Sequence, residues 1–176
     1  MYRAIVVVLA LVALLAGCGP PNRGHRFEVV KGAGYEGAIV PASMVPTRLL
    51  ASGESTWSPR PADVAAFEAT FAVYLQRAAD GAVVSPPIEF QPDQPPRDLT
   101  ELRALVSSLP LARRQYFGIV SDTRRLLRVK SFQDVPDFSN WRDQVIWGVD
   151  YGCGMWSVTF DTANRRIEGF GCQGSP

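Results

Sequence analysis

The C-terminal stretch, residues 145–172, constrains the fold most, because apolar and polar residues alternate along it with the two-residue period of β-strands. Its apolar positions form three short runs, which are Val145, Trp147, Val149 and Tyr151, then Trp156, Val158 and Phe160, and then Ile167 and Phe170. The positions opposite the second run are Met155, Ser157, Thr159 and Asp161. The pattern predicts three antiparallel strands in a meander, with one sheet face buried and the other in water.

A second strand-like region precedes the meander. Residues 116–120 and 126–132 have the strand period and flank the polar residues 121–124. Two such runs around a short polar segment are typical of a β-hairpin. With the meander, this hairpin gives an antiparallel sheet of about five strands.

Two stretches upstream follow the helical period instead. In the first, Pro61 suits the first helical position and the Asp-Gly pair at residues 80–81 supplies a stop. Its apolar stripe is Val64, Phe67, Phe71, Tyr74, Leu75 and Ala78. In the second, Asp98 and Glu101 have the spacing of a capping box and Pro110 ends the pattern. We therefore predict an α+β fold, with two helices packed on one face of the sheet.

The N-terminus carries an apolar run over residues 4–15, which ends in Leu-Ala-Gly-Cys at residues 15–18. The run is shorter than the about 20 residues that span a bilayer, and its basic start and small-residue exit are typical of an export signal. The Leu-Ala-Gly-Cys sequence resembles the lipobox of bacterial lipoproteins. The resemblance implies a signal peptide over residues 1–17 and a Cys18 acylated with chains such as palmitate, which anchors the protein to a membrane of the cell envelope.

The resemblance leaves a leader without lipidation as the alternative. Because Gly19 follows the cysteine, the resemblance implies that the protein is delivered to the outer membrane, facing the periplasm, in a Gram-negative host. Residues 18–34 are rich in Gly, Pro and polar side chains and predict a flexible tether, which leaves residues 35–176 as a single domain.

Two features argue against nucleotide and nucleic-acid partners. Residues 32–37 match the dinucleotide fingerprint GxGxxG, but Pro41 and Pro46 interrupt the helix that this motif requires. The net charge is +1 and the two signs are interspersed, so the sequence predicts no basic field that would hold nucleic acid.

Two cysteines remain besides the lipidated one. An even pair in an exported domain predicts a disulfide bridge, here between Cys153 and Cys172. A tight turn between the last two strands would place Cys153 opposite Cys172 and Val158 opposite Ile167, and a longer turn would shift this register by a residue or two. The alternative is a redox or metal-binding thiol pair, but the sequence lacks the CxxC spacing and the nearby histidine that favour one.

The histidine content limits the enzyme classes. His25 is the only histidine and lies in the predicted tether, so the predicted domain holds no Ser-His-Asp triad, Cys-His dyad or multi-histidine metal site. We predict no cofactor and no metal. The remaining candidates are Asp150, Asp161 and Glu168, acids on the meander that would suit a glycosidase-type carboxylate pair but are ordinarily solvated charges.

The body of the chain has four pieces that carry a resemblance, which are residues 57–59, 114–116 with Gly118, 152–154 and 156–161. In these pieces it is similar to exported bacterial proteins that have no assigned role. This resemblance implies no activity. We predict a lipid-anchored, non-enzymatic binding or interaction module of the envelope, whose partner is an envelope protein or a glycan. The alternative is a carboxylate-dependent hydrolase of envelope glycans, and a purely structural spacer is a third hypothesis.

Overall fold

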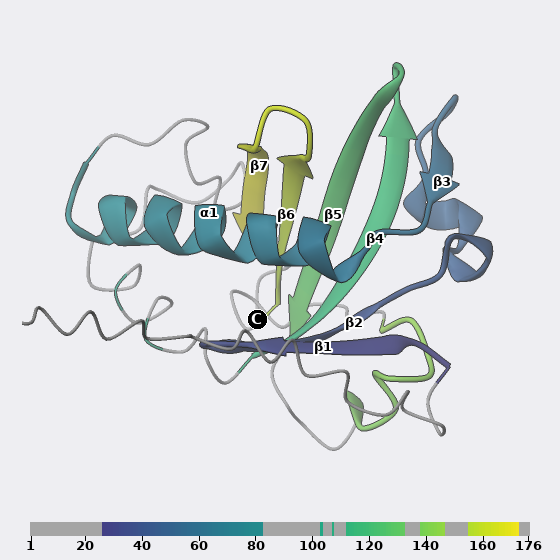
Figure 1. The fold of residues 1–176 in the computed structure, drawn as a ribbon, viewed down its shortest axis with the longest axis horizontal. Helices are drawn as coiled ribbons and strands as arrows, with labels where there is room; N and C mark the ends of the chain where they lie inside the picture. Colours follow the sequence, from purple (N-terminus) through teal and green to yellow (C-terminus); the bar gives the residue numbers. More distant parts are fainter. Residues whose placement is uncertain are drawn as a thin grey trace, which may run out of the picture.

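The computed structural model describes residues 26–82, 103, 107, 112–132, 138–146 and 155–172. Within these ranges the chain has a mixed α+β fold, with a long α-helix, α1, lying across a seven-stranded sheet (Figure 1). The elements are β1 Glu28–Gly32, β2 Tyr35–Ile39, η1 Ala42–Met44, η2 Thr47–Leu49, β3 Ser55–Trp57, α1 Pro61–Ala79, β4 Arg113–Ser121, β5 Arg124–Phe132, β6 Trp156–Asp161 and β7 Arg166–Cys172. The predicted α+β class is confirmed.

The strands are hydrogen-bonded in the order β1-β2-β4-β5-β6-β7, and β3 pairs with the C-terminal half of β4. Among the described strands only β2 and β4 are parallel, with Glu36 beside Arg113 and Ile39 beside Tyr116. The prediction of about five antiparallel strands missed this pair and the three strands that precede the helix. The parallel pairing is possible because a long connection that includes α1 returns the chain to the same edge.

Strand β1 lies inside the range that composition predicted as a tether. Its five residues pair with β2, so the folded part begins before residue 35 and the predicted boundary is too late. The Gly- and Pro-rich composition ends near Gly24, while Phe27 and Val30 are buried. The fingerprint-like glycines belong to this hairpin, and Gly34 in its turn has φ +79°, a conformation that glycine adopts without strain.

Helix α1 has the predicted bounds, and all six residues of its predicted apolar stripe are buried. The Arg60 backbone N–H donates to Asp63 Oδ2 at 2.9 Å, which satisfies a donor at the start of the helix. Gly81, at φ +82°, ends it. Of the second predicted helix, only Arg103 and Ser107 are among the described residues.

The apolar side of α1 packs on the sheet face that we call the helix face. Sheet residues of this core are Tyr116, Leu127, Val129, Trp156, Val158, Phe160, Ile167 and Phe170. Phe71 lies at its centre, with its ring centroid 5.1 Å from that of Phe67 and 5.0 Å from that of Trp156. The aromatic stripe of α1 is therefore core.

The opposite face, which we call the outer face, is also covered over β4 and β5, contrary to the prediction of one wet face. Phe117, Ile119, Leu126 and Phe132 pack there against residues from η1, η2 and residues 138–146. Gln115 holds residues 138–146 in place. Its Nε2 donates to Trp141 O and Gln144 O, both at 2.6 Å, and its Oε1 accepts from Ile146 N at 2.8 Å. The alternation of β6 alone did not reveal this second layer.

The predicted hairpin is confirmed as β4 and β5, joined by Asp122 and Thr123. The tight-turn register predicted for β6 and β7 is wrong, because Val158 faces Phe170 and not Ile167, and Trp156 faces Cys172. The alternative of a longer turn, which shifts the register by a residue or two, holds next to the turn, where Phe160 faces Ile167. A four-residue turn over residues 162–165 and a bulge at Thr159/Phe160 account for the shift.

The start of the predicted meander is largely outside the described part of the chain. Val145 and Ile146 lie in irregular structure, and residues 147–154 are not among the described residues. The predicted first meander strand and the predicted bridge from Cys153 to Cys172 therefore stay predictions.

Candidate functional site

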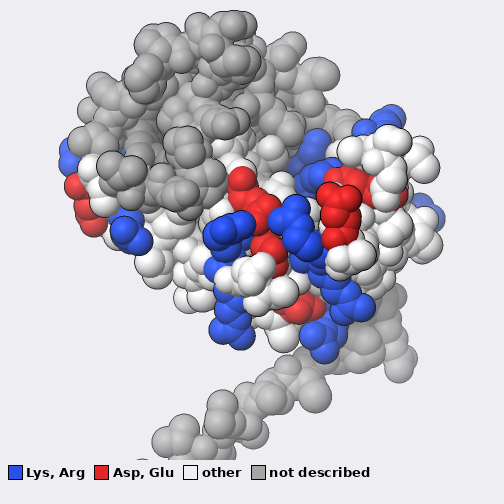
Figure 2. Space-filling model, turned by 90° about the horizontal axis from the view of Figure 1, so that it is seen from above, with Lys and Arg blue, Asp and Glu red and all other residues white. Residues whose placement is uncertain are grey.

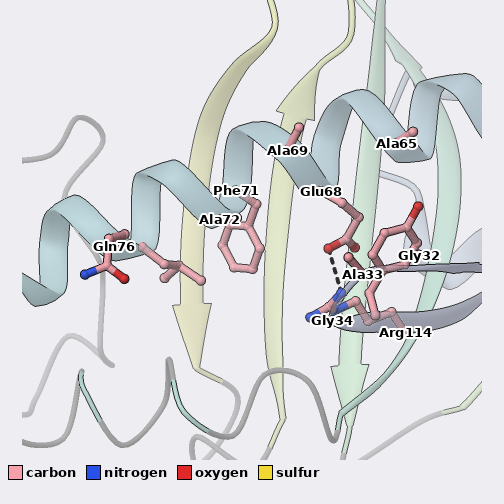
Figure 3. Close-up of a pocket in the computed structure, with 12 residues that line it drawn as sticks. Gly32, Ala33, Gly34, Ala65, Glu68, Ala69, Phe71, Ala72, Gln76 and Arg114 are labelled. Atoms are coloured by element: carbon pink, nitrogen blue, oxygen red, sulfur yellow. Dashed lines mark hydrogen bonds and ion pairs between the residues drawn. The ribbon is translucent and has the colours of Figure 1, made fainter. Parts of the chain in front are cut away.

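A groove of about 490 Å³ lies between α1 and the turn that joins β1 to β2. Its described lining is Gly32, Ala33, Gly34, Tyr35, Ala65, Glu68, Ala69, Phe71, Ala72, Leu75, Gln76 and Arg114. Apolar atoms make up most of this wall; Glu68 and Arg114 lie together at one end, and Gln76 lies at the opposite end (Figure 3). The charged side chains therefore lie at one end of a largely apolar groove, which we call the polar end.

The groove exists because α1 presents small side chains on one side. Ala65, Ala69 and Ala72 are exposed and, with Gln76, recur at helical spacing along that side. Larger residues there would reach the β1–β2 turn. Phe71 and Leu75, both fully buried, form the deeper apolar wall.

The polar end is built from a buried ion pair between the helix and the sheet. Arg114 Nη1 lies 2.6 Å from Glu68 Oε2, and Tyr116 Oη donates to Glu68 Oε1 at 2.8 Å. Figure 3 shows Glu68 descending from α1 to meet Arg114 beside Gly34. Both charged groups are almost removed from water, with 9% of Glu68 and 2% of Arg114 exposed. A single carboxylate thus binds a cation and a phenol from one strand.

Aromatic rings enclose the guanidinium of Arg114. Its Cζ lies 5.9 Å from the ring centroid of Tyr35 and 5.6 Å from that of Trp156, distances typical of cation–π contacts. Tyr35 is itself part of the groove wall. The cation is therefore fixed by Glu68 on one side and by rings on the others, and its position does not depend on a flexible loop.

Burial shifts the proton affinities at this end of the groove. It raises the pKa of Glu68, an effect that the charge of Arg114 and the hydrogen bonds from Tyr116 and Arg114 only partly oppose. Burial and the neighbouring Glu68 carboxylate likewise raise the pKa of Tyr35, and they raise that of Tyr116 well above its usual value. Both phenols therefore stay protonated and can donate hydrogen bonds at neutral pH.

The two described acids of the hydrolase hypothesis lie away from the groove. Asp161 is buried and accepts from Ala163 N, Asn164 N and Asn164 Nδ2, all at 2.9 Å. These bonds lower the pKa of Asp161, and the bond from Asn164 N has the largest effect. Asp161 is thus a turn-forming residue and not the solvated charge that was predicted, and Asp150 lies outside the described residues.

Glu168 lies between two cations at the end of the sheet. Its oxygens are 2.6 Å from Arg166 Nη2 and 2.9 Å from Arg124 Nη1, and these two arginines lower its pKa. Figure 2 shows this end of the molecule, where basic and acidic side chains are interleaved over the turns and do not form a patch of one sign. Glu168 is therefore engaged in ion pairs with Arg124 and Arg166.

Cys18 and His25 precede the described residues, so the lipidation prediction is not placed in the structure. In the described ranges no group of three or more His, Cys, Asp or Glu side chains could hold a metal ion. Also within these ranges, no helix has both the length and the apolar content to cross a membrane.

Sequence reasoning missed Glu68 and Arg114. The available signal was the position of Glu68 on the buried side of α1, between Phe67 and Phe71, since a carboxylate on an apolar side needs a partner of opposite charge. The sequence does not show which arginine provides it. Comparison of the chain with protein-family models, curated proteins and solved structures gives no match.

Proposed function

We propose that this protein is a binding module of the bacterial cell envelope, anchored through lipid on Cys18, that holds a small amphiphilic ligand in the groove beside α1. The observation that carries the proposal is the groove of about 490 Å³ with the buried Arg114–Glu68 pair at its polar end. Small-molecule sites have volumes of about 300–1,000 Å³ and combine apolar walls with a few fixed polar groups.

The ligand chemistry follows from the charges of the polar end. Arg114 and Glu68 neutralise each other, so a ligand with a net charge would have to displace one member of a buried pair. A neutral hydrogen-bonding group can instead bind beside the pair. Its apolar body would lie along Ala65, Ala69 and Ala72, where contact removes apolar surface from water.

The test uses Nile red, a neutral amphiphilic dye, with the full-length protein. We expect its fluorescence to rise on binding and the increase to saturate at one dye per chain. Ala69→Trp fills the groove and should abolish saturable binding. The control is Val73→Trp, because Val73 is on the same helix and 61% exposed but does not line the groove. Equal dye binding by both variants would refute the groove as the site.

The anchor is a separate part of the proposal, supported by the resemblance of residues 15–18 to a lipobox. Cys18→Ser should move the protein from the membrane fraction of the host to the soluble fraction. Mass spectrometry of the wild-type N-terminus should find acyl chains on Cys18. An unmodified cysteine in the mature protein would refute lipidation but leave the groove proposal standing.

A further inference from the structure

The groove beside α1 has the shape of a straight slot. Its two sides are lined by residues whose side chain is a methyl group or a hydrogen, which are Ala65, Ala69 and Ala72 on the helix and Gly32, Ala33 and Gly34 on the hairpin. Glu68 and Gln76 lie at its two ends (Figure 3) and are eight positions apart, which is about 12 Å along the helix axis. A slot of this length with no bulky side chain on either side fits an extended alkyl chain.

The hairpin turn leaves free space inside the groove. A Cβ placed on Gly34 would meet no atom within 4 Å, although Gly34 lines the groove. Phe71 and Leu75, which form the deeper wall, are apolar side chains that a chain in the groove would contact. An alkyl chain can therefore lie beside the turn without displacing the backbone, and its contact with the deeper wall removes apolar surface from water.

Tyr35 brings a phenol hydroxyl to the polar end of the groove. Its ring lies over Gly32, where a Cβ would be 2.2 Å from Tyr35 Cε1 and 2.7 Å from Tyr35 Oη. The same ring lies against Arg114, whose Cζ is 5.9 Å from the ring centroid. The missing side chain of Gly32 and the fixed guanidinium of Arg114 thus set the position of the Tyr35 hydroxyl.

This hydroxyl is a hydrogen-bond donor that the ion pair does not use. The two Glu68 oxygens accept from Arg114 Nη1 and Tyr116 Oη, and no hydrogen bond among the described residues involves Tyr35 Oη. Burial and the Glu68 charge raise the pKa of Tyr35, so its hydroxyl stays protonated at neutral pH. Since Tyr35 is only half-buried, a ligand can reach this donor, and an uncharged carbonyl oxygen is the acceptor that complements it.

We infer that the ligand of the groove is an uncharged fatty acyl ester, whose carbonyl oxygen accepts a hydrogen bond from Tyr35 Oη and whose alkyl chain lies along α1 toward Gln76. This inference rests on the proposed function and names the ligand class of the same site. A charged head group would have to displace one member of the Arg114–Glu68 pair, whereas an ester carbonyl leaves the pair intact.

The test is isothermal titration of the full-length protein with 1-hexanoylglycerol, 1-octanoylglycerol and 1-decanoylglycerol, each below its critical micelle concentration. We expect one ligand per chain. The affinity should rise about fourfold for each added methylene, because each methylene takes more apolar surface out of water. An affinity that does not change with chain length would overturn the assignment of an alkyl chain to the groove.

The Tyr35 hydroxyl is tested from the protein and from the ligand. Tyr35→Phe keeps the ring and should weaken the binding of 1-octanoylglycerol roughly three- to tenfold. The ether 1-O-octylglycerol has no carbonyl, so the wild type and Tyr35→Phe should bind it equally. The wild type should also bind the ester more tightly than the ether, a comparison that needs no variant. Equal binding of the ester by Tyr35→Phe and the wild type would overturn the role of Tyr35.

The matched control is Tyr74→Phe, which removes a phenol hydroxyl from α1 outside the groove lining and should bind 1-octanoylglycerol like the wild type. The dye experiment separates this inference from the proposed function. Saturable binding of Nile red without binding of any acylglycerol would overturn the ligand class and leave the groove proposal standing. Binding of neither would refute both.

Discussion

Glu68 and Arg114 meet across the interface between α1 and β4, with Arg114 Nη1 2.6 Å from Glu68 Oε2. The two residues are 46 positions apart in the sequence, and Tyr116 completes the network from the same strand as Arg114. The pair therefore fixes where the helix lies on the sheet and also forms the polar end of the groove. The contribution of this pair to the free energy of unfolding can be measured separately from its role in binding.

The first prediction concerns the stability of this pair. Glu68→Leu should lower the free energy of unfolding by about 3–5 kcal/mol, because Arg114 then stays buried without its carboxylate. The double variant Glu68→Leu with Arg114→Met should be much less destabilised than the sum of the single variants. Urea unfolding of the four proteins measures the coupling. Additive losses would contradict a coupled pair.

The second prediction is a pH dependence. The pKa of Glu68 is raised in the folded state, so the folded protein binds this proton more tightly than the unfolded chain does. Its contribution to stability is therefore full below the unfolded pKa of about 4.3 and falls as pH rises through the folded pKa. The lowered pKa values of Asp161 and Glu168 act in the opposite direction, so the comparison needs Glu68→Gln.

The measurement is the free energy of unfolding of the wild type and of Glu68→Gln between about pH 4 and pH 8, the range in which a raised carboxyl pKa is expressed. We expect the wild type to lose stability relative to the variant as pH increases. A difference between the two proteins that does not change with pH would show that Glu68 titrates normally.

The third prediction compares two glycines on the sheet. A Cβ on Gly118 would lie 2.1 Å from Trp57 O, where β3 pairs with β4. Gly118→Ala should cost about 1–3 kcal/mol or detach β3, because the clash is with backbone. Gly169→Ala is the control, since its Cβ meets nothing within 4 Å, and it should change stability by less than about 1 kcal/mol. Thermal unfolding of both variants is sufficient.

The fourth prediction is the disulfide bridge between Cys153 and Cys172. Thiol titration of the unfolded, unreduced protein should find neither cysteine reactive. Replacing both with Ala should lower the free energy of unfolding by about 3 kcal/mol, the value expected for a closed loop of roughly 20 residues. Two reactive thiols would favour the redox or ligand hypothesis instead.

Local patterns predicted the elements whose determinants are close in sequence. The bounds of α1 follow from Pro61 and Gly81, and the β4–β5 hairpin follows from the polar turn at residues 121–124. Pairings that join distant segments were not predictable in this way. Glu36 lies 77 positions from Arg113, and no period in the sequence links β2 to β4.

The candidate site shows the same limit. The prediction considered acids on the C-terminal strands, but the carboxylate of the groove is on the helix and its partner is at the start of β4. Glu68 lies within a stripe of apolar residues on α1, and Arg114 lies at the start of a strand, so neither position indicated a site in the sequence.

The parallel pairing of β2 with β4 also sets an order of events during synthesis. A chain is made from its N-terminus at about 5–20 residues per second, so the 77 positions from Glu36 to Arg113 take about 4–15 s to produce. For that interval the β1–β2 hairpin lacks its neighbour, and an isolated two-stranded hairpin is at best marginally stable in water. Strands β1 and β2 therefore lack their partner strand until β4 has been synthesised. Any factor that protects the nascent protein must shield these two strands for the longest time.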